Sequence, residues 1–337
     1  MTPHSFHGRT VLVTGATGFV GNHLAKRLKR EGARLKLLVR DPAKVPAFLC
    51  DQDDIIQGDL TDAATLGPAL QGAEWVFHCA ANVSTWDRQE QYEAVNVMGV
   101  RHLMQAIEAQ AVRPQRLVHV STVDVYGLPA HPCDESCPPR LPGFGYGDSK
   151  LRGERLLQEH AHRLRLPFVI LRPTNVMGPG SPFIDRIGHE LRSGLMLRVA
   201  GGAADVGFLY VENLVDCLLW AAQAPQAAGE VYNVVDPEAI TWRRFLDDLR
   251  QGIGGRGWII DLPYPVAHAA AAVVETPYRL LRIRSEPLLH RMIVKMFGRT
   301  CGHSAAKLAA AGCPVGRIPY AQAMAESIVW FQANHPL

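Results

Sequence analysis

The sequence of 337 residues lacks a long hydrophobic run, and this argues against a membrane-spanning protein. Its longest nearly uncharged apolar stretch, Leu262–Val274, is interrupted by Pro265 and His268 and is too short to cross a bilayer. The N-terminal residues do not show the charged and then apolar segments of a secretory signal peptide. The sequence therefore predicts a soluble protein of the cytoplasm.

A large excess of one charge is also lacking. Lys and Arg number 35 against 32 Asp and Glu, which leaves a net charge of +3. Nucleic-acid-binding proteins usually carry a basic patch or stripe, so this balance gives no indication of a nucleic-acid partner. Hydrophobic residues at 47% and charged residues at 20% are typical of a globular protein and exclude a disordered chain.

No C-x-x-C pair occurs among the seven cysteines. An odd number of cysteines without paired spacing indicates free thiols in a reducing compartment, and not a disulfide framework. Cys301, His303 and Cys313 lie near one another in the sequence, but their spacing matches no common zinc site. We therefore expect no metal centre.

Short apolar runs alternate with amphipathic segments up to Arg172. The strand candidates are Thr10–Thr14, Leu35–Val39, Asp54–Ile56, Trp75–Cys79, Leu117–Val120 and Phe168–Leu171. The helical patterns between them lie near Phe19–Arg30, Ala63–Leu70, Glu90–Ala109 and Tyr146–His160. Continuous apolar runs suit strands that are covered on both faces. The alternation therefore predicts an α/β fold with a doubly wound parallel sheet.

The alternation weakens after Arg172, where prolines and glycines interrupt the chain. Further helical patterns lie near Ile184–Ser193, Glu212–Ala222, Thr241–Gln251 and Pro319–Gln332, and further short strands at Tyr232–Val235 and Trp258–Ile260. No internal repeat or low-complexity linker separates the two parts. We expect residues 8–172 to form the sheet domain. Residues 173–337 are expected to form a smaller, mostly helical lobe that is interleaved with this domain and does not fold independently.

A glycine-rich turn follows the first predicted strand and precedes the first predicted helix. Its glycines, Gly15, Gly18 and Gly21, have the spacing G-x-x-G-x-x-G. In a strand–turn–helix unit they allow a sharp turn, close approach of the backbone to a pyrophosphate, and tight packing of the helix on the strand. The helix N-terminus supplies free N–H groups for phosphates. The context predicts a dinucleotide site that contains Gly15, Thr17, Gly18, Phe19, Val20 and Gly21.

The residue after the second predicted strand favours NADP over NAD. An acidic residue at this position would bind the ribose hydroxyls of NAD, but Arg40 stands there instead. A guanidinium group suits a 2′-phosphate, and Lys44 could assist it. The alternative is that Asp41 takes the acidic role and that Arg40 is a solvated strand end, which keeps NAD open.

Tyr146 and Lys150 are four residues apart, so both project from one face of the predicted helix. Upstream, the segment 120–127 (VSTVDVYG) places hydroxyl groups at the end of a predicted strand. Ligands of doubly wound sheets bind outside these strand ends. The two segments are therefore expected to meet at one site.

These motifs together resemble the extended short-chain dehydrogenase/reductase family. The segments TGATGFVG, GDL, HCAA, VSTVDVYG, YGDSK and LRPTNVMGPG occur in the family's order over essentially the whole chain. The resemblance implies a Rossmann-type first domain that binds NAD(P) and a second lobe that binds substrate. It also implies cofactor contacts from Asp59, Leu60, Ala80, Ala81 and Pro173.

The resemblance further implies a catalytic set. Tyr146 would be the general acid for carbonyl reduction, or the base for the reverse reaction. Lys150 would lower the pKa of the Tyr146 phenol and bind the nicotinamide ribose. Thr122 would hydrogen-bond the substrate oxygen, with Ser121 as the alternative one residue earlier, and Asn96 matches the family's helix asparagine.

The branch of the family is less clearly marked. Dehydratases place Asp-Glu directly after the catalytic Thr, whereas Val123 and Asp124 follow Thr122 here. The arginine that epimerases usually carry before the aromatic residue of a late segment is absent from 205–213, although Asn175 matches an epimerase-like position. The C-terminal lobe looks like the sterol-dehydrogenase and 3β-hydroxysteroid-dehydrogenase-like branch, and Arg40 suits dihydroflavonol-reductase-like members.

The lobe is mostly apolar, which suits a lipophilic substrate. Basic residues gather over 279–299 between apolar ones. They could rest on an anionic membrane surface, but a solvated face of a substrate lid is the favoured interpretation. Trp86 could line the substrate pocket or belong to the core or surface.

We predict an NADP-dependent oxidoreductase that moves hydride between nicotinamide and a secondary alcohol or ketone of a lipophilic substrate. The alternatives are a sugar-nucleotide 4-epimerase with tightly bound NAD and a regulator that senses NADPH without catalysis. By analogy with the family, a homodimer could form through Glu90–Ala109 and Tyr146–His160.

Overall fold

The computed structural model describes residues 6–45, 47–49, 53–127, 129, 133–141, 143, 145–281, 283, 285–287, 289–299 and 302–336. Its strands are β1 Thr10–Thr14, β2 Arg34–Val39, β3 Asp54–Gln57, β4 Trp75–His78, β5 Arg116–Val120, β6 Phe168–Pro173, β7 Asn175–Met177, β8 Leu195–Val199, β9 Phe208–Tyr210, β10 Glu230–Val234 and β11 Trp258–Leu262.

The helices follow the strands in regular alternation through the first part of the chain. The α-helices are α1 Phe19–Arg30, α2 Leu66–Leu70, α3 Gln89–Tyr92, α4 Gly99–Glu108, α5 Gly145–Leu164, α6 Pro182–Ser193, α7 Val211–Gln223, α8 Trp242–Gly252, α9 Tyr264–Leu280, α10 Arg291–Gly298, α11 Ala306–Ala310 and α12 Tyr320–Asn334. One turn of π-helix, η4 Glu93–Met98, joins α3 to α4. Short 3₁₀ turns are η1 Pro42–Lys44, η2 Ala47–Leu49, η3 Ala63–Thr65, η5 Val123–Tyr126, η6 Ala200–Gly202 and η7 Pro225–Ala227.

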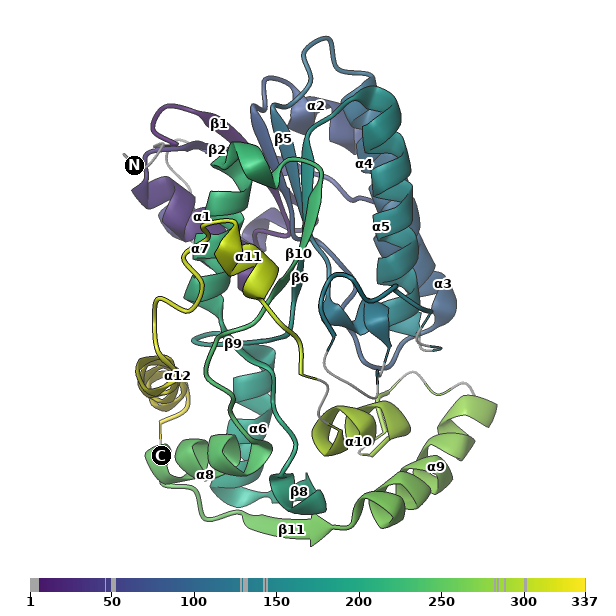
Figure 1. The fold of residues 1–337 in the computed structure, drawn as a ribbon, viewed down its shortest axis with the longest axis vertical. Helices are drawn as coiled ribbons and strands as arrows, with labels where there is room; N and C mark the ends of the chain where they lie inside the picture. Colours follow the sequence, from purple (N-terminus) through teal and green to yellow (C-terminus); the bar gives the residue numbers. More distant parts are fainter. Residues whose placement is uncertain are drawn as a thin grey trace.

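Seven parallel strands form the main sheet in the order β10-β6-β5-β4-β1-β2-β3. Helices cover both faces, with α1 and α7 on one side and α4 and α5 on the other (Figure 1). Val11 and Val13 of β1 pack toward α1 and α7, whereas Leu12 packs toward α2, α4 and α5. The prediction of a Rossmann-type doubly wound parallel sheet is therefore confirmed.

The second part of the chain both extends the sheet and builds the lobe. β10 pairs with β6 at the sheet edge, and α7 covers one face, although both elements follow residue 172. The division into 8–172 and 173–337 stays a prediction. The lobe has its own core around Trp242, whose ring stacks on Phe297 with 4.0 Å between ring centroids. The lobe lies at the opposite end of the molecule from β1 and β5 (Figure 1).

Three short strands were not expected from the sequence. β7 pairs with β9, and β8 pairs with β11, each as a parallel pair outside the main sheet. β7 and β9 have three residues each, which is too short to show a periodic pattern. Their pairing depends on contacts between distant segments, which local patterning does not encode.

The cysteines and the hydrophobic segments agree with the composition argument. Cys79, Cys133, Cys137, Cys217 and Cys313 are free thiols. Cys50 and Cys301 lie outside the described residues, and so does part of the group that was weighed as a zinc site. Within the described ranges, no helix combines the length and apolar character needed to cross a membrane.

Gly21 tests how tightly α1 packs on the turn. A Cβ atom at Gly21 would lie 2.1 Å from the Gly15 carbonyl oxygen, whereas a Cβ at Gly67 of α2 would meet nothing within 4 Å. We expect Gly21→Ala to destabilise the protein by about 1–3 kcal/mol through overpacking. Gly67→Ala should be neutral or stabilise it by up to about 1 kcal/mol. Urea unfolding of the two variants checks this, and equal stabilities would contradict the packing argument.

Candidate active site

The glycine turn at the end of β1 is shaped for a phosphate group. Gly15 has φ +76°, and a Cβ atom there would lie 2.8 Å from the Ala80 backbone nitrogen. Gly18 precedes α1, and neither a side-chain cap nor an acidic residue occupies the first turn of this helix. The first N–H groups of α1 are therefore left for a ligand, and the helix dipole favours an anion. The cradle fits the pyrophosphate of a dinucleotide, with Thr17, Phe19 and Val20 in the same segment.

The two residues that follow β2, Arg40 and Asp41, differ in their contacts. Arg40 is exposed, and its guanidinium makes no hydrogen bond or ion pair with any described residue. The Asp41 carboxylate accepts a hydrogen bond from the Ala43 backbone N–H at 3.1 Å and so caps η1. Asp41 is thus engaged in a local turn, while Arg40 is free to meet a ligand.

The segments after β3 and β4 carry further residues that are expected to contact a cofactor. Asp59 accepts hydrogen bonds from the Thr61 backbone N–H at 2.8 Å and from the Thr61 hydroxyl at 2.9 Å. Leu60 is buried beneath Gly99 of α4, where a Cβ atom would lie 3.0 Å from the Leu60 Cβ. Ala80 and Ala81 are half-buried beside Gly15, and Pro173 is buried at the end of β6.

Lys150 is the most deeply desolvated cation of the site. Its side chain is 3% exposed, and Nζ donates a 2.7 Å hydrogen bond to the Val120 carbonyl at the end of β5. Burial lowers its pKa from 10.5 to about 8, although Glu154 opposes this change. The ammonium group therefore lies at the carboxyl ends of the central strands, where the fold is expected to hold the nicotinamide ribose.

Two buried histidines line the sheet next to Lys150. The rings of His78 on β4 and His119 on β5 stack with centroids 5.1 Å apart. Burial and the nearby Lys150 charge lower the pKa of His78 to about 3, and the pKa of His119 is also lowered well below its usual value. Both imidazoles are therefore neutral at physiological pH, and Lys150 is the cation of this region.

Tyr146, Thr122 and Asp124 form a connected group. The Asp124 backbone N–H donates a 3.2 Å hydrogen bond to the Thr122 hydroxyl, and Thr122 and Asp124 both lie close enough to Tyr146 to act on the pKa of its phenol. Burial, and then the Asp124 charge, raise the pKa of Tyr146, while Thr122 lowers it. The lowering by Lys150 that the family resemblance implied does not appear here. The phenol is therefore held in its protonated form.

The structure places Thr122 and Ser121 differently. Thr122 lines an adjoining cavity of about 260 Å³, whereas Ser121 does not, and the Ser121 hydroxyl is buried without a hydrogen-bond partner in the described part of the chain. The catalytic role of Thr122 stays a prediction.

Asn96 holds the backbone beside the site in place. Its Oδ1 accepts from the Asn82 backbone N–H at 2.8 Å, and its Nδ2 donates to the Asn82 carbonyl and to the Ser149 hydroxyl, both at 2.9 Å. The π-helical turn η4 brings it there, and such turns often occur at functional sites. These contacts give Asn96 a positioning role between the HCAA segment and the helix that carries Tyr146.

A buried polar network supports the opposite side of the site. Arg172 donates to both carboxylate oxygens of Glu154, at 3.0 and 2.6 Å, and to the Tyr126 hydroxyl at 2.8 Å. The Tyr126 hydroxyl donates in turn to Asn233 Oδ1 at 2.9 Å. These contacts tie Tyr126 into the buried network.

The cavity beside Thr122 extends to the lobe, where it is both apolar and basic. Its lining includes the apolar Val206, Met292 and Met296, the basic Arg279, Arg291, Lys295 and Arg299, and the acidic Asp124 and Asp205. Arg279 and Arg291 pair with the buried Glu275. Lys295 makes no ion pair with a described residue, and the Arg299 guanidinium lies 5.2 Å from the Tyr264 ring centroid. Most of the cations expected on a solvated or membrane-facing surface thus face the cavity; Arg282 and Arg284 lie outside the described residues.

Trp86 does not line the cavity. Its indole N–H donates to the Ile283 carbonyl at 3.3 Å, and Arg279 lies over its ring at 5.5 Å. It fixes the end of α9 to the loop after β4.

Sequence reasoning did not select Asp124, the two histidines or the cavity cations as site residues. Asp124 had a sequence signal, since it stands two residues after Thr122, but the cations come from a lobe whose placement no motif reveals.

The site combines a glycine turn that fits a dinucleotide with a Tyr–Lys pair beside a strand end that carries hydroxyl groups. This combination defines an oxidoreductase of the extended short-chain dehydrogenase/reductase type. Residues 11–234 match the NAD dependent epimerase/dehydratase family, and the chain belongs to this family. The family and the enzyme class predicted from the motifs are therefore confirmed.

Individual relatives include reductases and an epimerase. The chain is 28% identical over 296 residues to 2-alkyl-3-oxoalkanoate reductase of Stenotrophomonas maltophilia, covering 85% of this chain and 88% of that protein. It is 30% identical over 291 residues to the 4-hydroxy-2-methyl-3-oxo-4-farnesyl-3,4-dihydroquinoline-1-oxide ketoreductase of Stigmatella aurantiaca, covering 85% and 86%. UDP-glucose 4-epimerase of Thermus thermophilus, solved with NAD, shares the fold with a TM-score of 0.76 at 22% identity, over 97% of this chain and 100% of that chain.

The burial of Lys150 predicts a pH dependence of stability. The folded protein binds fewer protons than the unfolded one between pH values of about 8 and 10.5, so its free energy of unfolding should rise as the pH rises through this window. Between pH 7 and pH 10 the free energy of unfolding of the wild type should rise by about 2 kcal/mol more than that of Lys150→Met. Urea unfolding at both pH values measures it. The variant Lys26→Met, at an exposed site, should follow the wild type; a Lys150→Met protein that also follows it would contradict the desolvation argument.

Proposed function

We propose that the protein is an NADP-dependent reductase of a ketone whose substrate combines an apolar body with an acidic group. The observation that carries this proposal is a protonated Tyr146 with Thr122 near it, and a cavity at Thr122 whose wall holds Met292, Met296 and two cations, Lys295 and Arg299, that form no ion pair with a described residue. The family membership supports an oxidoreductase, and the two reductase relatives support the direction of the reaction.

The catalytic steps assigned to the chain's own residues are proton transfer and positioning. NADPH, when bound, supplies the hydride. The Thr122 hydroxyl would hold the carbonyl oxygen, and the Tyr146 phenol would give that oxygen a proton as the alcohol forms. A phenol with a raised pKa is protonated at neutral pH, which suits an acid in reduction better than a base in oxidation. Lys150 would hold the nicotinamide ribose and add positive charge near the phenol.

The preference for NADP rests on the different contacts of Arg40 and Asp41. Arg40 is exposed at the end of β2 and forms no ion pair with a described residue, while the Asp41 carboxylate caps η1. A free guanidinium suits the charge and the oxygens of a 2′-phosphate.

The sequence predicts a lipophilic substrate, and the cavity walls favour one that is amphiphilic. Met292 and Met296 give adaptable apolar contacts. Lys295 and Arg299 form no ion pair with a described residue, although Asp124 and Asp205 also line the cavity. A carboxylate or similar anion on the substrate would pair with these two cations. An oxoalkanoate, the substrate type in the name of one relative, combines an apolar chain with such a group.

Two features of the sequence prediction stay predictions. One is a cytoplasmic location; the other is a homodimer through the helices around α4 and α5, which pack against each other on one face of the sheet. The epimerase and regulator alternatives are separated from the reductase by the turnover experiment below.

The turnover experiment follows NADPH oxidation with a long-chain 3-oxo acid and with its methyl ester. We expect the acid to be reduced with the higher kcat/KM, because only the acid can pair with Lys295 and Arg299. Tyr146→Phe should lower kcat at least about a hundredfold while NADPH affinity is kept. A Tyr146→Phe enzyme that retains its activity would overturn the mechanism, and a protein that releases stoichiometric NAD on denaturation would indicate the epimerase. NADPH binding without turnover of any ketone tested would favour the regulator.

The cofactor preference is tested at the end of β2. Arg40→Ser should raise the Kd for NADPH about 10- to 100-fold, since charge-assisted hydrogen bonds are lost, and should leave the Kd for NADH nearly unchanged. Asp41→Asn serves as the matched control and should change neither constant much. Fluorescence titration measures both. Weaker NADH binding in Asp41→Asn, with an unaffected Arg40→Ser protein, would show that Asp41 reads the ribose of NAD.

A further inference from the structure

The lobe exposes an apolar surface at the end of the molecule away from the main sheet. Trp258 on β11 is 78% exposed, and Leu195 and Ile260 are also exposed. In the parallel pair of β8 and β11, Trp258 lies opposite Leu195, and Ile260 is two residues further along the same face. Large exposed apolar side chains on one face of a two-stranded sheet indicate a surface that binds another molecule or a membrane.

Helix α9, which follows β11 directly, adds an apolar stripe at the same end (Figure 1). Its inner face is formed by the buried Ala267, Ala271 and Glu275. On the opposite side, Val266, Val273 and Leu280 are exposed at seven-residue intervals, which places them on one stripe of the helix. The outer side of α9 therefore presents apolar residues that no described part of the chain covers.

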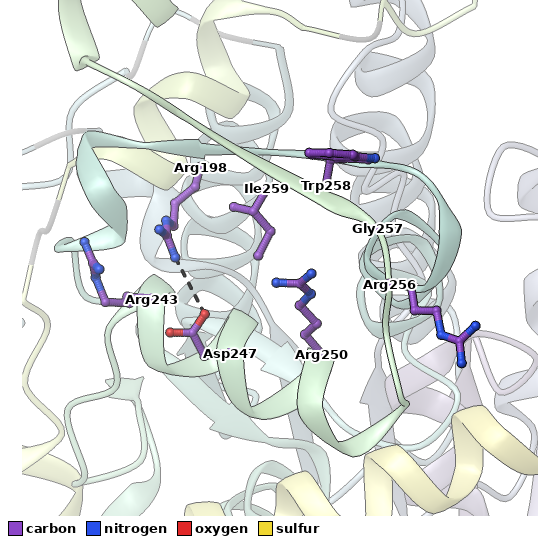
Figure 2. Close-up of a pocket in the computed structure, with 8 residues that line it drawn as sticks. All are labelled: Arg198, Arg243, Asp247, Arg250, Arg256, Gly257, Trp258 and Ile259. Atoms are coloured by element: carbon purple, nitrogen blue, oxygen red, sulfur yellow. Dashed lines mark ion pairs between the residues drawn. The ribbon is translucent and has the colours of Figure 1, made fainter.

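A basic cavity of about 520 Å³ adjoins this apolar sheet (Figure 2). Arg243, Asp247 and Arg250 share one face of α8, and Arg198 reaches toward them from β8. The Arg198 guanidinium is neutralised by Asp261 at 2.7 Å and Asp247 at 3.6 Å. Arg243 and Arg250 make no ion pair with any described residue, and the Nε of Arg250 is buried without a hydrogen-bond partner there. Trp258 stands at the rim of this cavity (Figure 2).

We propose that this end of the lobe docks on an anionic phospholipid bilayer. Arg243 and Arg250 would receive a lipid phosphate, while Trp258, Ile260 and the outer stripe of α9 would enter the boundary between headgroups and acyl chains. Tryptophan is favoured at this boundary, and each basic residue near an anionic membrane surface adds attraction. The surface is separate from the active-site cavity, so the proposal stands without the proposed reductase function.

Charge argues for lipid over a second copy of the chain. A symmetric contact between two copies would bring the same arginine-rich patch against itself, and like charges would oppose it. A free anion alone would satisfy the arginines, but it would leave the apolar side chains in water. An anionic bilayer meets both requirements.

The test is sedimentation of the full chain with vesicles. We expect binding to vesicles that contain phosphatidylglycerol, little binding to pure phosphatidylcholine, and release at high salt. The double change Arg243→Gln with Arg250→Gln should lower partitioning about tenfold or more. Trp258→Ser should also weaken it. NADPH-dependent turnover of a soluble substrate should be unchanged in all of these variants, which separates a failure here from a failure of the proposed activity.

Matched controls come from the sheet domain. Val112→Ser and Arg34→Gln alter exposed residues far along the chain from the lobe and should bind vesicles like the wild type. Equal binding to neutral and anionic vesicles, or no binding to either, would overturn the proposal. So would thermal stabilisation by glycerol phosphate without vesicle binding, which would mark a site for a soluble anion. A dimer in solution that Trp258→Ser dissociates would show that the surface binds a second copy.

Discussion

The buried ammonium group of Lys150 is the constraint around which the active site is arranged. Its hydrogen bond to the Val120 carbonyl compensates part of the loss of water, and Glu154 is the opposing charge that acts on it most strongly. Glu154 is itself held by two nitrogens of the Arg172 guanidinium. A lysine with a lowered pKa is costly to bury in its charged form. The buried ammonium group lies where hydroxyl groups of a bound ligand would hydrogen-bond to it and reduce this cost.

Burial, and then the positive charge of Lys150, fix the state of two neighbouring imidazoles. Both effects lower the pKa of His78 and of His119, so the two stacked rings stay neutral, and His78 Nδ1 is hydrogen-bonded to the Thr14 hydroxyl at 2.8 Å. The acidic group of the site, Asp124, lies near Thr122 and Tyr146, where its charge adds to the effect of burial in raising the pKa of the phenol. The cation and the carboxyl group thus act on different ionisable neighbours.

Local chemistry explains why the cofactor half could be predicted from the sequence. The Gly15–Gly21 turn, the strand end at Arg40 and the spacing of Tyr146 and Lys150 each lie within one strand–helix unit, and the backbone geometry of such a unit is set by its own residues. The helix and strand bounds of the sheet agree for the same reason, because continuous apolar runs and amphipathic helices are local patterns. The π-helical turn that brings Asn96 to Asn82 and Ser149 has no such pattern and was found only in the structure.

The substrate half could not be predicted because its charges are distributed by tertiary packing. The sequence shows basic and apolar residues interleaved over 279–299, a pattern that a solvated lid and a membrane surface share. In the fold, Glu275 is buried between α9 and α10 and draws Arg279 and Arg291 inward, while Lys295 and Arg299 follow them along the cavity wall. The outer side of α9 is left with valine and leucine. The hairpin of α9 and α10 therefore carries basic side chains toward the cavity and apolar ones on the outer side of α9, an arrangement that the proposed acidic substrate and the proposed lipid surface would each require.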